Sequence, residues 1–136
     1  MIKNKGGSII ITSSIAGLRA EVPEVAPASY GASKAAIINL TQVAAMEYVK
    51  DGIRVNCIAP GMHKSELGRP RNVRVSSKTI KEGEKMIEAY CAAEVPMGRF
   101  ADAAELKGLA VLLASDASSY ITGQVFAQDG GQSARL

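Results

Sequence analysis

The sequence lacks several features that would set it apart from ordinary globular proteins. It has no tryptophan, only 4% aromatic residues, and no apolar run close to the roughly 20 residues that cross a bilayer. Its first five residues lead into a strand-like segment without an apolar region, so we expect neither a secretory signal nor a membrane partner. Apolar residues make up 47% and charged residues 21%, which is typical of a chain with a packed core.

Cysteine and histidine are also scarce. The two cysteines, Cys57 and Cys91, have neither a metal-ligand spacing nor the pattern of a disulfide framework. We therefore expect no metal site and two reduced thiols, as in a cytoplasmic protein. With one histidine and neither a G-x-S-x-G nor an S-x-x-K motif, the chain does not fit a serine hydrolase.

The apolar pattern predicts strands that alternate with helices. Strands are expected over residues 8–13, 53–59 and 124–128. Helices are expected over residues 32–50, 79–93 and 103–115, with a loop over 15–29 and an irregular basic segment over 62–78. A strand-helix-strand succession makes a right-handed crossover in a parallel sheet, so we predict an α/β fold whose first two strands are buried on both faces.

Two of the predicted helices carry further information. Asp102, with Glu105 three residues later, has the spacing of a capping box at the start of the last helix. The helix over 32–50 is apolar on more than one face, so we expect its sheet to cover one side and another subunit to cover the other.

The pattern that points most directly to chemistry is a tyrosine followed four residues later by a lysine. Tyr30 and Lys34 would share one face of a helix, and Ser14 ends an apolar run sixteen residues before the tyrosine. A cation beside a phenol favours the phenolate form, so such a tyrosine can give or take a proton near neutral pH. These residues alone also fit a surface lysine beside a half-buried tyrosine.

Several ordered segments resemble the carboxyl-terminal half of the short-chain dehydrogenase/reductase family. The matching segments are residues 7–14, 30–36, 52–61, 96–100 and 113–131. The resemblance implies a Rossmann-type doubly wound parallel sheet, of which this chain carries three strands and their helices. It also implies an oxidoreductase that uses NAD or NADP to transfer a hydride to a carbonyl or from an alcohol, with a sugar acid or a 3-oxoacyl compound as possible substrate.

The same resemblance assigns catalytic roles to three residues. Tyr30 would be the general acid and base, and Lys34 would hold the nicotinamide ribose while favouring the phenolate of Tyr30. Ser14, which matches the second serine of the family motif, would form a hydrogen bond with the substrate oxygen. Ser13 would then pack or cap locally.

Further cofactor contacts are implied after the second strand, beyond those of Tyr30 and Lys34. Pro60 and Gly61 would let the backbone pass close to the nicotinamide, and Ser65 stands where the family has a threonine that contacts the carboxamide or phosphate. His63 replaces the usual isoleucine or valine, so its backbone contact is expected and its side chain has no assigned role.

The family's glycine-rich phosphate-binding turn is absent from the sequence. Residues 1–136 are therefore expected to be the carboxyl-terminal part of one Rossmann-type domain, without the dinucleotide-binding amino-terminal half. Two readings follow: an active oxidoreductase, or an inactive fragment that folds or oligomerises without turnover.

The expected partners are a small substrate and further copies of the chain, as a dimer or a tetramer. Seven basic and three acidic side chains give residues 64–85 a net charge of +4, but interleaved aromatic residues are missing, so we expect no nucleic acid. Arg69, Arg71 or Arg74 could instead recognise an anionic substrate, and a solvated loop is the alternative.

Overall fold

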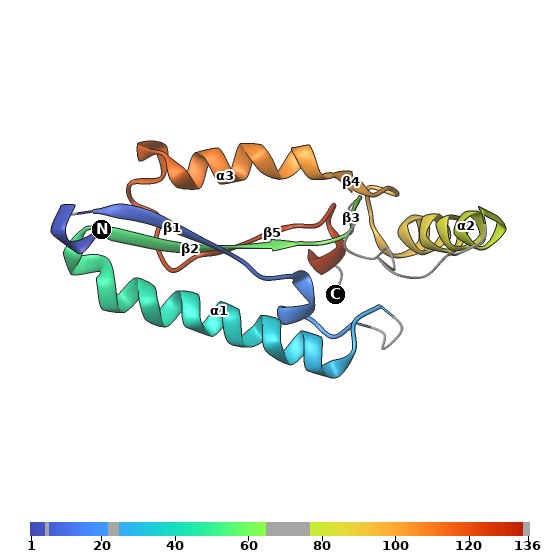
Figure 1. The fold of residues 1–136 in the computed structure, drawn as a ribbon, viewed down its shortest axis with the longest axis horizontal. Helices are drawn as coiled ribbons and strands as arrows, with labels where there is room; N and C mark the ends of the chain where they lie inside the picture. Colours follow the sequence, from blue (N-terminus) through green and yellow to red (C-terminus); the bar gives the residue numbers. More distant parts are fainter. Residues whose placement is uncertain (5, 22–24, 65–76, 135–136) are drawn as a thin grey trace.

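The computed structural model describes residues 1–4, 6–21, 25–64 and 77–134, which form three layers (Figure 1). The central layer is a parallel sheet with the strand order β1-β2-β5, made of β1 (Gly7–Thr12), β2 (Ile53–Pro60) and β5 (Val125–Gln128). Helix α1 (Ala28–Tyr48) lies on one face, and helix α3 (Leu106–Ala114) lies on the other. Helices on both faces of a parallel sheet confirm the predicted α/β class.

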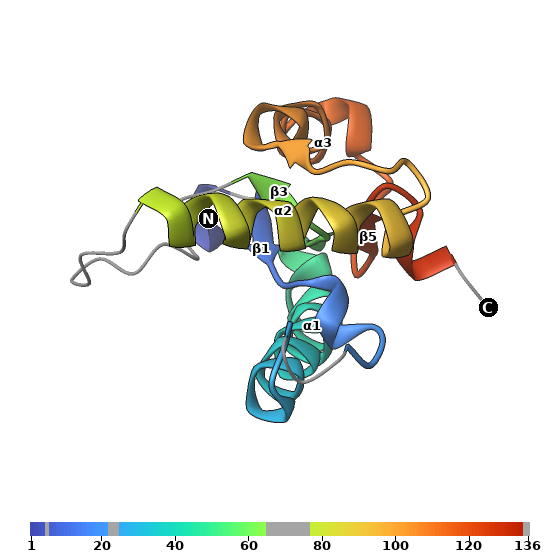
Figure 2. The ribbon, with the colours of Figure 1, turned by 90° about the vertical axis from the view of Figure 1, so that its right-hand side faces the viewer.

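The remaining elements are short, apart from one helix. They are the 3-10 turns η1 (Ile2–Asn4), η2 (Ile15–Gly17), η3 (Val49–Asp51), η5 (Ala103–Glu105), η6 (Asp116–Ser118) and η7 (Gln132–Ala134), the paired strands β3 (His63–Lys64) and β4 (Ala101–Asp102), and helix α2 (Ser77–Glu94). Viewed from the carboxyl ends of the strands, α2 crosses in front of the sheet (Figure 2). Within the described ranges, no helix has the length and apolar character needed to traverse a membrane.

The two strands predicted to be buried on both faces differ in their burial. In β2, Val55, Cys57 and Ala59 are completely buried, because this strand is central and pairs on both sides. In β1, Ile9 and Ile11 are only half-buried. The prediction was wrong for β1, since it lies at the edge of the described sheet and has a neighbour on one side only.

Helix α1 starts four residues earlier than its apolar pattern predicted. Pro27 is extended and precedes the first turn, where the Tyr30 N–H donates to the Pro27 carbonyl at 2.9 Å. Proline fixes its own φ and lacks an N–H, so it is well suited to stand at the start of a helix. Tyr30 and Lys34 therefore both lie within the first two turns of α1.

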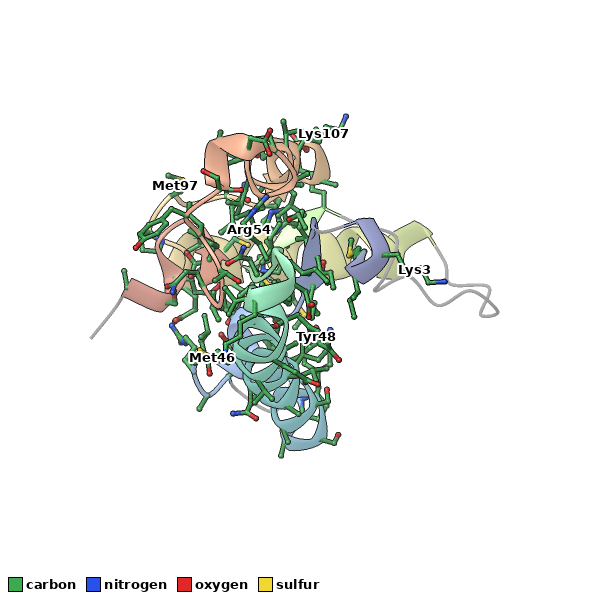
Figure 3. The ribbon with its side chains drawn as sticks, turned by 90° about the vertical axis from the view of Figure 1, so that its left-hand side faces the viewer. Lys3, Met46, Tyr48, Arg54, Met97 and Lys107 are labelled. Carbon is green, nitrogen blue, oxygen red and sulfur yellow. The ribbon has the colours of Figure 1, made fainter. Side chains whose placement is uncertain are left out.

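Only one side of α1 is covered by the sheet. Thr41 and Ala45 are buried, whereas four large apolar side chains are exposed, namely Leu40, Val43, Met46 and Val49. Met46 and Tyr48 project from opposite sides of the helix (Figure 3), and Tyr48 packs against the core with Val55. No element of the described residues covers the other side of α1, where a second subunit was expected.

Arg54 fixes the end of α3 against the sheet. Its guanidinium lies between β2 and α3 (Figure 3) and donates to Ser118 Oγ at 2.7 Å and to the carbonyls of Leu113 and Ser115 at 3.0 and 3.1 Å. Ser8 Oγ also donates to the Leu113 carbonyl, at 2.7 Å. Because the last carbonyls of a helix have no partner within it, these bonds stabilise the carboxyl end of α3.

Candidate active site

The residues predicted to be catalytic lie at the edge of the sheet where the parallel strands end. Ser13 and Ser14 follow β1 directly, and Gly61 follows β2. In open α/β sheets this carboxyl edge is the usual place for a ligand. The predicted residues thus come from separate segments that the fold brings to one edge.

Tyr30 and Lys34 lie next to each other on α1, as their spacing predicted. The Lys34 ammonium is 5.4 Å from the centre of the Tyr30 ring. This distance is within the range of a cation–π contact, and the Tyr30 side chain remains open to solvent, at 39% exposure. The phenol is therefore accessible to a reacting molecule while a cation stays beside it.

Ser14 forms the start of the turn η2. Its Oγ accepts a hydrogen bond from the Ala16 N–H at 3.2 Å. A hydroxyl also has one proton to donate, and within the described residues that proton has no acceptor. Ser14 is thus able to donate a hydrogen bond to an oxygen of a bound molecule.

Gly17 brings the loop after Ser14 onto the turn of α1 that carries Lys34. A Cβ at Gly17 would stand 2.6 Å from the Lys34 carbonyl carbon and 2.8 Å from the Ala35 nitrogen. No other residue allows so close an approach of two backbones without a shift. This contact was not predicted from the sequence, although a glycine three residues after the serine pair was a visible signal.

Ser13 ties the end of β1 to the same turn from inside the protein. It is buried, and its Oγ donates to the Lys34 carbonyl at 2.7 Å. The prediction that it packs or caps locally is confirmed only in part, because its partner is 21 residues away. Ser13 and Gly17 together set the position of Lys34 relative to Ser14.

Cys57 is a buried, free cysteine that lies beneath this site. Burial raises the pKa of the Cys57 thiol, against smaller opposing contributions from the Ser13 backbone, the Thr41 hydroxyl and the Lys34 charge. Burial likewise raises the pKa of Cys91, and both cysteines are free and buried. The predicted absence of a disulfide between them is confirmed.

The cofactor contacts predicted after β2 involve Gly61, His63 and Ser65, of which the first two lie within the described residues. The Gly61 N–H donates to the Gln128 carbonyl at 3.0 Å, and a Cβ at Gly61 would stand 2.6 Å from that of Asp129, so the glycine is already required by β5. His63 lies on β3, and its Nδ1 is 3.1 Å from the Gly61 carbonyl, while its Nε2 has no partner among the described residues. Ser65 lies outside the described residues.

Two cavities occur elsewhere in the molecule. One of about 750 Å³ lies between α2 and the start of α3 and has the ion pairs Lys64–Asp102 and Arg99–Glu105 on its wall. The other, of about 330 Å³, lies beside the end of β5. Neither is lined by Ser14, Tyr30 or Lys34. Ser14, Tyr30 and Lys34 therefore lie outside these two cavities.

The fold and the site together define the class of protein. It is an α/β protein with a Rossmann-type parallel sheet, and a serine, a tyrosine and a lysine lie at the carboxyl edge of that sheet. Residues 1–133 match the family model described as enoyl-(acyl carrier protein) reductase. The chain belongs to the short-chain dehydrogenase/reductase family.

Two relatives are 46% and 39% identical to this chain over the aligned residues. Galactitol 2-dehydrogenase of Agrobacterium fabrum is 46% identical over 128 residues, which cover 93% of this chain and 48% of the relative. A 3-oxoacyl-[acyl-carrier-protein] reductase of Chlamydia trachomatis is 39% identical over 131 residues, covering 96% and 47% respectively. This chain spans about half the length of these relatives.

A solved structure supports the same fold. The gluconate 5-dehydrogenase of Burkholderia cenocepacia, crystallised with NADP and tartrate, superimposes with a TM-score of 0.81 at 30% identity. The match covers 99% of this chain and 48% of that protein. The predicted Rossmann-type fold is confirmed.

Proposed function

We propose that this chain supplies the catalytic portion of an NAD(P)-dependent oxidoreductase that transfers a hydride between a nicotinamide cofactor and a carbonyl or alcohol. The observation that carries the proposal is the accessible Tyr30 phenol beside the Lys34 ammonium, at the carboxyl edge of the sheet. The relatives described above are dehydrogenases and reductases, and one was crystallised with NADP.

The residues at this edge fit a nicotinamide nucleotide. Lys34 presents three N–H donors of the kind that ribose hydroxyls accept, and the carboxyl edge is open to solvent beside it. Tyr30 and Lys34, with the backbone at Pro60, Gly61 and His63, would hold the cofactor, and Ser65 would add a hydroxyl. When bound, the nicotinamide supplies or accepts the hydride.

Ser14, Tyr30 and Lys34 would each have a different role in the proton transfer. Ser14 donates its free O–H to the substrate oxygen and so fixes that oxygen near the phenol. Tyr30 gives its proton to the oxygen in reduction and removes a proton from the alcohol in oxidation. The Lys34 ammonium, which lies beside the Tyr30 ring, would stabilise the negative charge on the phenol oxygen while the proton is absent.

The substrate class follows from the relatives. The relatives are named for galactitol, for gluconate and for a 3-oxoacyl group on an acyl carrier protein, so we propose a sugar, a sugar acid or a 3-oxoacyl compound. An anionic substrate remains our proposal; its suggested ligands Arg69, Arg71 and Arg74 lie outside the described residues. The two unpaired thiols suit a reducing compartment such as the cytoplasm.

The cofactor phosphates need a part that this sequence does not contain. Among the described residues β1 has a neighbouring strand on one side only, and the relatives are about twice as long as this chain. We therefore propose that residues 1–136 form the carboxyl-terminal part of a single Rossmann-type domain whose phosphate-binding half lies outside the given sequence.

Self-association is the second element of the proposal. Leu40, Val43, Met46 and Val49 expose an apolar stripe along α1, and Met46 has 79% of its surface in contact with solvent. Such a stripe gains stability by pairing with a second copy of itself across a two-fold axis. We propose a dimer or tetramer that uses this stripe.

Cofactor titration is the first experiment. NADH and NADPH are added to the purified chain and to the Tyr30→Phe variant while the reduced-nicotinamide fluorescence is followed, and turnover is then assayed with sugar, sugar-acid and 3-oxoacyl substrates. We expect binding by both proteins and turnover only by the wild type. If neither nucleotide binds, the inactive-fragment reading is favoured, since the open site and the half-length match agree with it.

A further inference from the structure

Four polar residues that the proposed chemistry does not use form a cluster behind the loop after β1. The Tyr90 hydroxyl donates to Glu21 Oε2 at 3.1 Å, and Gln132 Nε2 donates to the Tyr90 oxygen at 3.2 Å. Arg19 Nε lies 3.4 Å from Glu21 Oε1, and its Nη1 donates to the Gln132 carbonyl at 2.6 Å. We name these residues, Arg19, Glu21, Tyr90 and Gln132, the Tyr90 cluster.

Two members of the Tyr90 cluster have buried side chains, and Glu21 Oε1 and Gln132 Oε1 accept no hydrogen bond from the described residues. The Glu21 side chain is only 4% exposed, and Gln132 is completely buried. A buried carboxylate is costly unless it is paired, and a buried ion pair adds little net stability even when its geometry is good. Its contribution is to select one arrangement of the segments that carry it, because any other arrangement leaves a buried charge unpaired.

The cluster joins three segments that are far apart in the sequence. Tyr90 lies on α2, Glu21 on the loop that begins at Ser14, and Gln132 in the turn after β5. Burial, followed by the Glu21 charge, raises the pKa of the Tyr90 phenol, so the hydroxyl keeps its proton and stays a donor. Near the end of α2, the Met97 N–H donates to the Gly130 carbonyl at 3.1 Å and gives this part of the chain a second attachment.

Two of the joined segments lie at the carboxyl edge of the sheet. The loop that carries Glu21 rests on the turn of Lys34 through Gly17, and α2 crosses the carboxyl edge of the sheet (Figure 2). A displacement of α2 would therefore change the space at the carboxyl edge of the sheet, the edge at which β1 leads into Ser14. The hydrogen bond from Tyr90 to Glu21 resists that displacement directly.

We propose that Tyr90 and Glu21 are positioning residues that hold α2 across the carboxyl edge of the sheet as one wall of the substrate space. The identity of that space rests on the proposed function. The attachment of α2 does not, and it can be tested without activity.

The first test is amide hydrogen exchange over residues 77–94, measured by mass spectrometry on the full chain. Tyr90→Phe removes one hydroxyl and keeps the ring, and we expect exchange in α2 to become about three- to tenfold faster, the effect of one hydrogen bond. Tyr120→Phe is the matched control, because Tyr120 is fully exposed, and its exchange pattern should equal that of the wild type. Unchanged exchange in Tyr90→Phe, or an equal change in Tyr120→Phe, would overturn the proposal.

Variants at Glu21 provide a second, independent arm. Glu21→Gln keeps an oxygen that accepts from Tyr90, so α2 should exchange more slowly in this variant than in Glu21→Ala. The double variant Tyr90→Phe with Glu21→Ala should exchange no faster than the faster single variant, because both changes remove the same bond. Fully additive effects would show that the two residues act separately, and the proposal would be wrong.

Kinetics separate this proposal from the proposed function. In an active protein, Tyr90→Phe should raise KM for the substrate several-fold and leave kcat and the cofactor Kd nearly unchanged. Glu21→Gln should have a KM close to that of the wild type. If α2 exchanges faster and KM is unchanged, the claim that α2 forms one wall of the substrate space is wrong. If the wild type has no activity, the proposed function fails, and the exchange measurements still decide whether Tyr90 and Glu21 hold α2.

Discussion

The β1-α1-β2 unit and α2 are held in the molecule in different ways. The unit is built around a strand with completely buried residues such as Val55 and Cys57, and Ser13 bonds its helix to its first strand. Helix α2 has the Tyr90 cluster and a buried Cys91, while Met86 on the same helix is 75% exposed. The candidate proton chemistry therefore lies on the β1-α1-β2 unit, and the proposed substrate wall lies on α2.

This difference has a physical consequence for function. Catalytic groups must be held in a fixed geometry, which a buried strand and a bonded helix provide. A helix with fewer buried contacts opens more easily and adapts to what binds beneath it. The rate of the reaction and the choice of substrate should thus respond to changes in different regions.

Of the predicted effects, the largest is the loss of turnover on changing Tyr30, which lies on the β1-α1-β2 unit. Tyr30→Phe removes the proton donor but keeps the ring beside Lys34, so turnover should fall by about 10²- to 10⁴-fold while cofactor affinity stays nearly unchanged. Steady-state rates and fluorescence titration measure the two quantities. Lys34→Ala should reduce both of them.

The control for Tyr30→Phe is on the same helix. Tyr48→Phe removes a hydroxyl at the far end of α1, where the side chain packs against the core, and should leave the rate unchanged. A Tyr30→Phe protein with a normal rate would refute the assigned proton chemistry.

The next effect concerns stability and compares the two regions directly. Ile53 is buried at the start of β2, so Ile53→Ala should lower the free energy of unfolding by about 2–5 kcal/mol through lost burial and a residual cavity. Met86→Ala, on the exposed side of α2, should change it by no more than about 0.5 kcal/mol. Urea denaturation measures both, and equal losses would contradict the difference drawn between the regions.

A smaller effect should follow from Ser13→Ala. The variant loses the bond to the Lys34 carbonyl, which should cost about 0.5–1.5 kcal/mol of stability and lower kcat, since Lys34 moves relative to Ser14. Ser13→Thr keeps a hydroxyl and should restore kcat. Loss of stability without any change in kcat would mean that Ser13 supports the fold and does not position the site.

Local signals made much of this architecture predictable. Glycines and prolines bound the apolar strands, and the Asp102 and Glu105 spacing predicted a capping box whose bond from the Asp102 N–H to Glu105 is 2.8 Å long. Tyr30 and Lys34 were predictable because a helix places residues four apart on one face. Each of these signals lies within a few consecutive residues.

Features that depend on distant segments were not predictable in this way. The Tyr90 and Glu21 side chains are 69 residues apart, and Arg19 bonds to a carbonyl 113 residues away. The half-buried state of β1 depends on which strands flank it, and the sequence of β1 resembles that of a central strand. Long-range pairing is decided by the whole chain, so no local pattern reports it.

The smallest effect is expected where the segment after α2 meets α3. Arg99 donates two hydrogen bonds to Glu105, at 2.8 and 2.9 Å, and with the Asp102 N–H they lower the pKa of Glu105 from 4.5 to about 2. A carboxylate whose pKa is lower in the folded protein stabilises it above the unfolded pKa, and that contribution is lost as the pH falls from 4.5 to about 2.

Glu105 and Arg99 are both largely open to solvent, so the stabilisation is small and screened by salt. Glu105→Gln should therefore slightly reduce stability at neutral pH and flatten the pH dependence between 4.5 and about 2, as read from urea midpoints at several pH values. Asp116→Asn, on the short turn after α3, is a control with the same change of charge and should leave that slope unchanged. If Glu105→Gln keeps the wild-type slope, the Arg99 pair does not stabilise the contact between the segment after α2 and the start of α3 in a pH-dependent way.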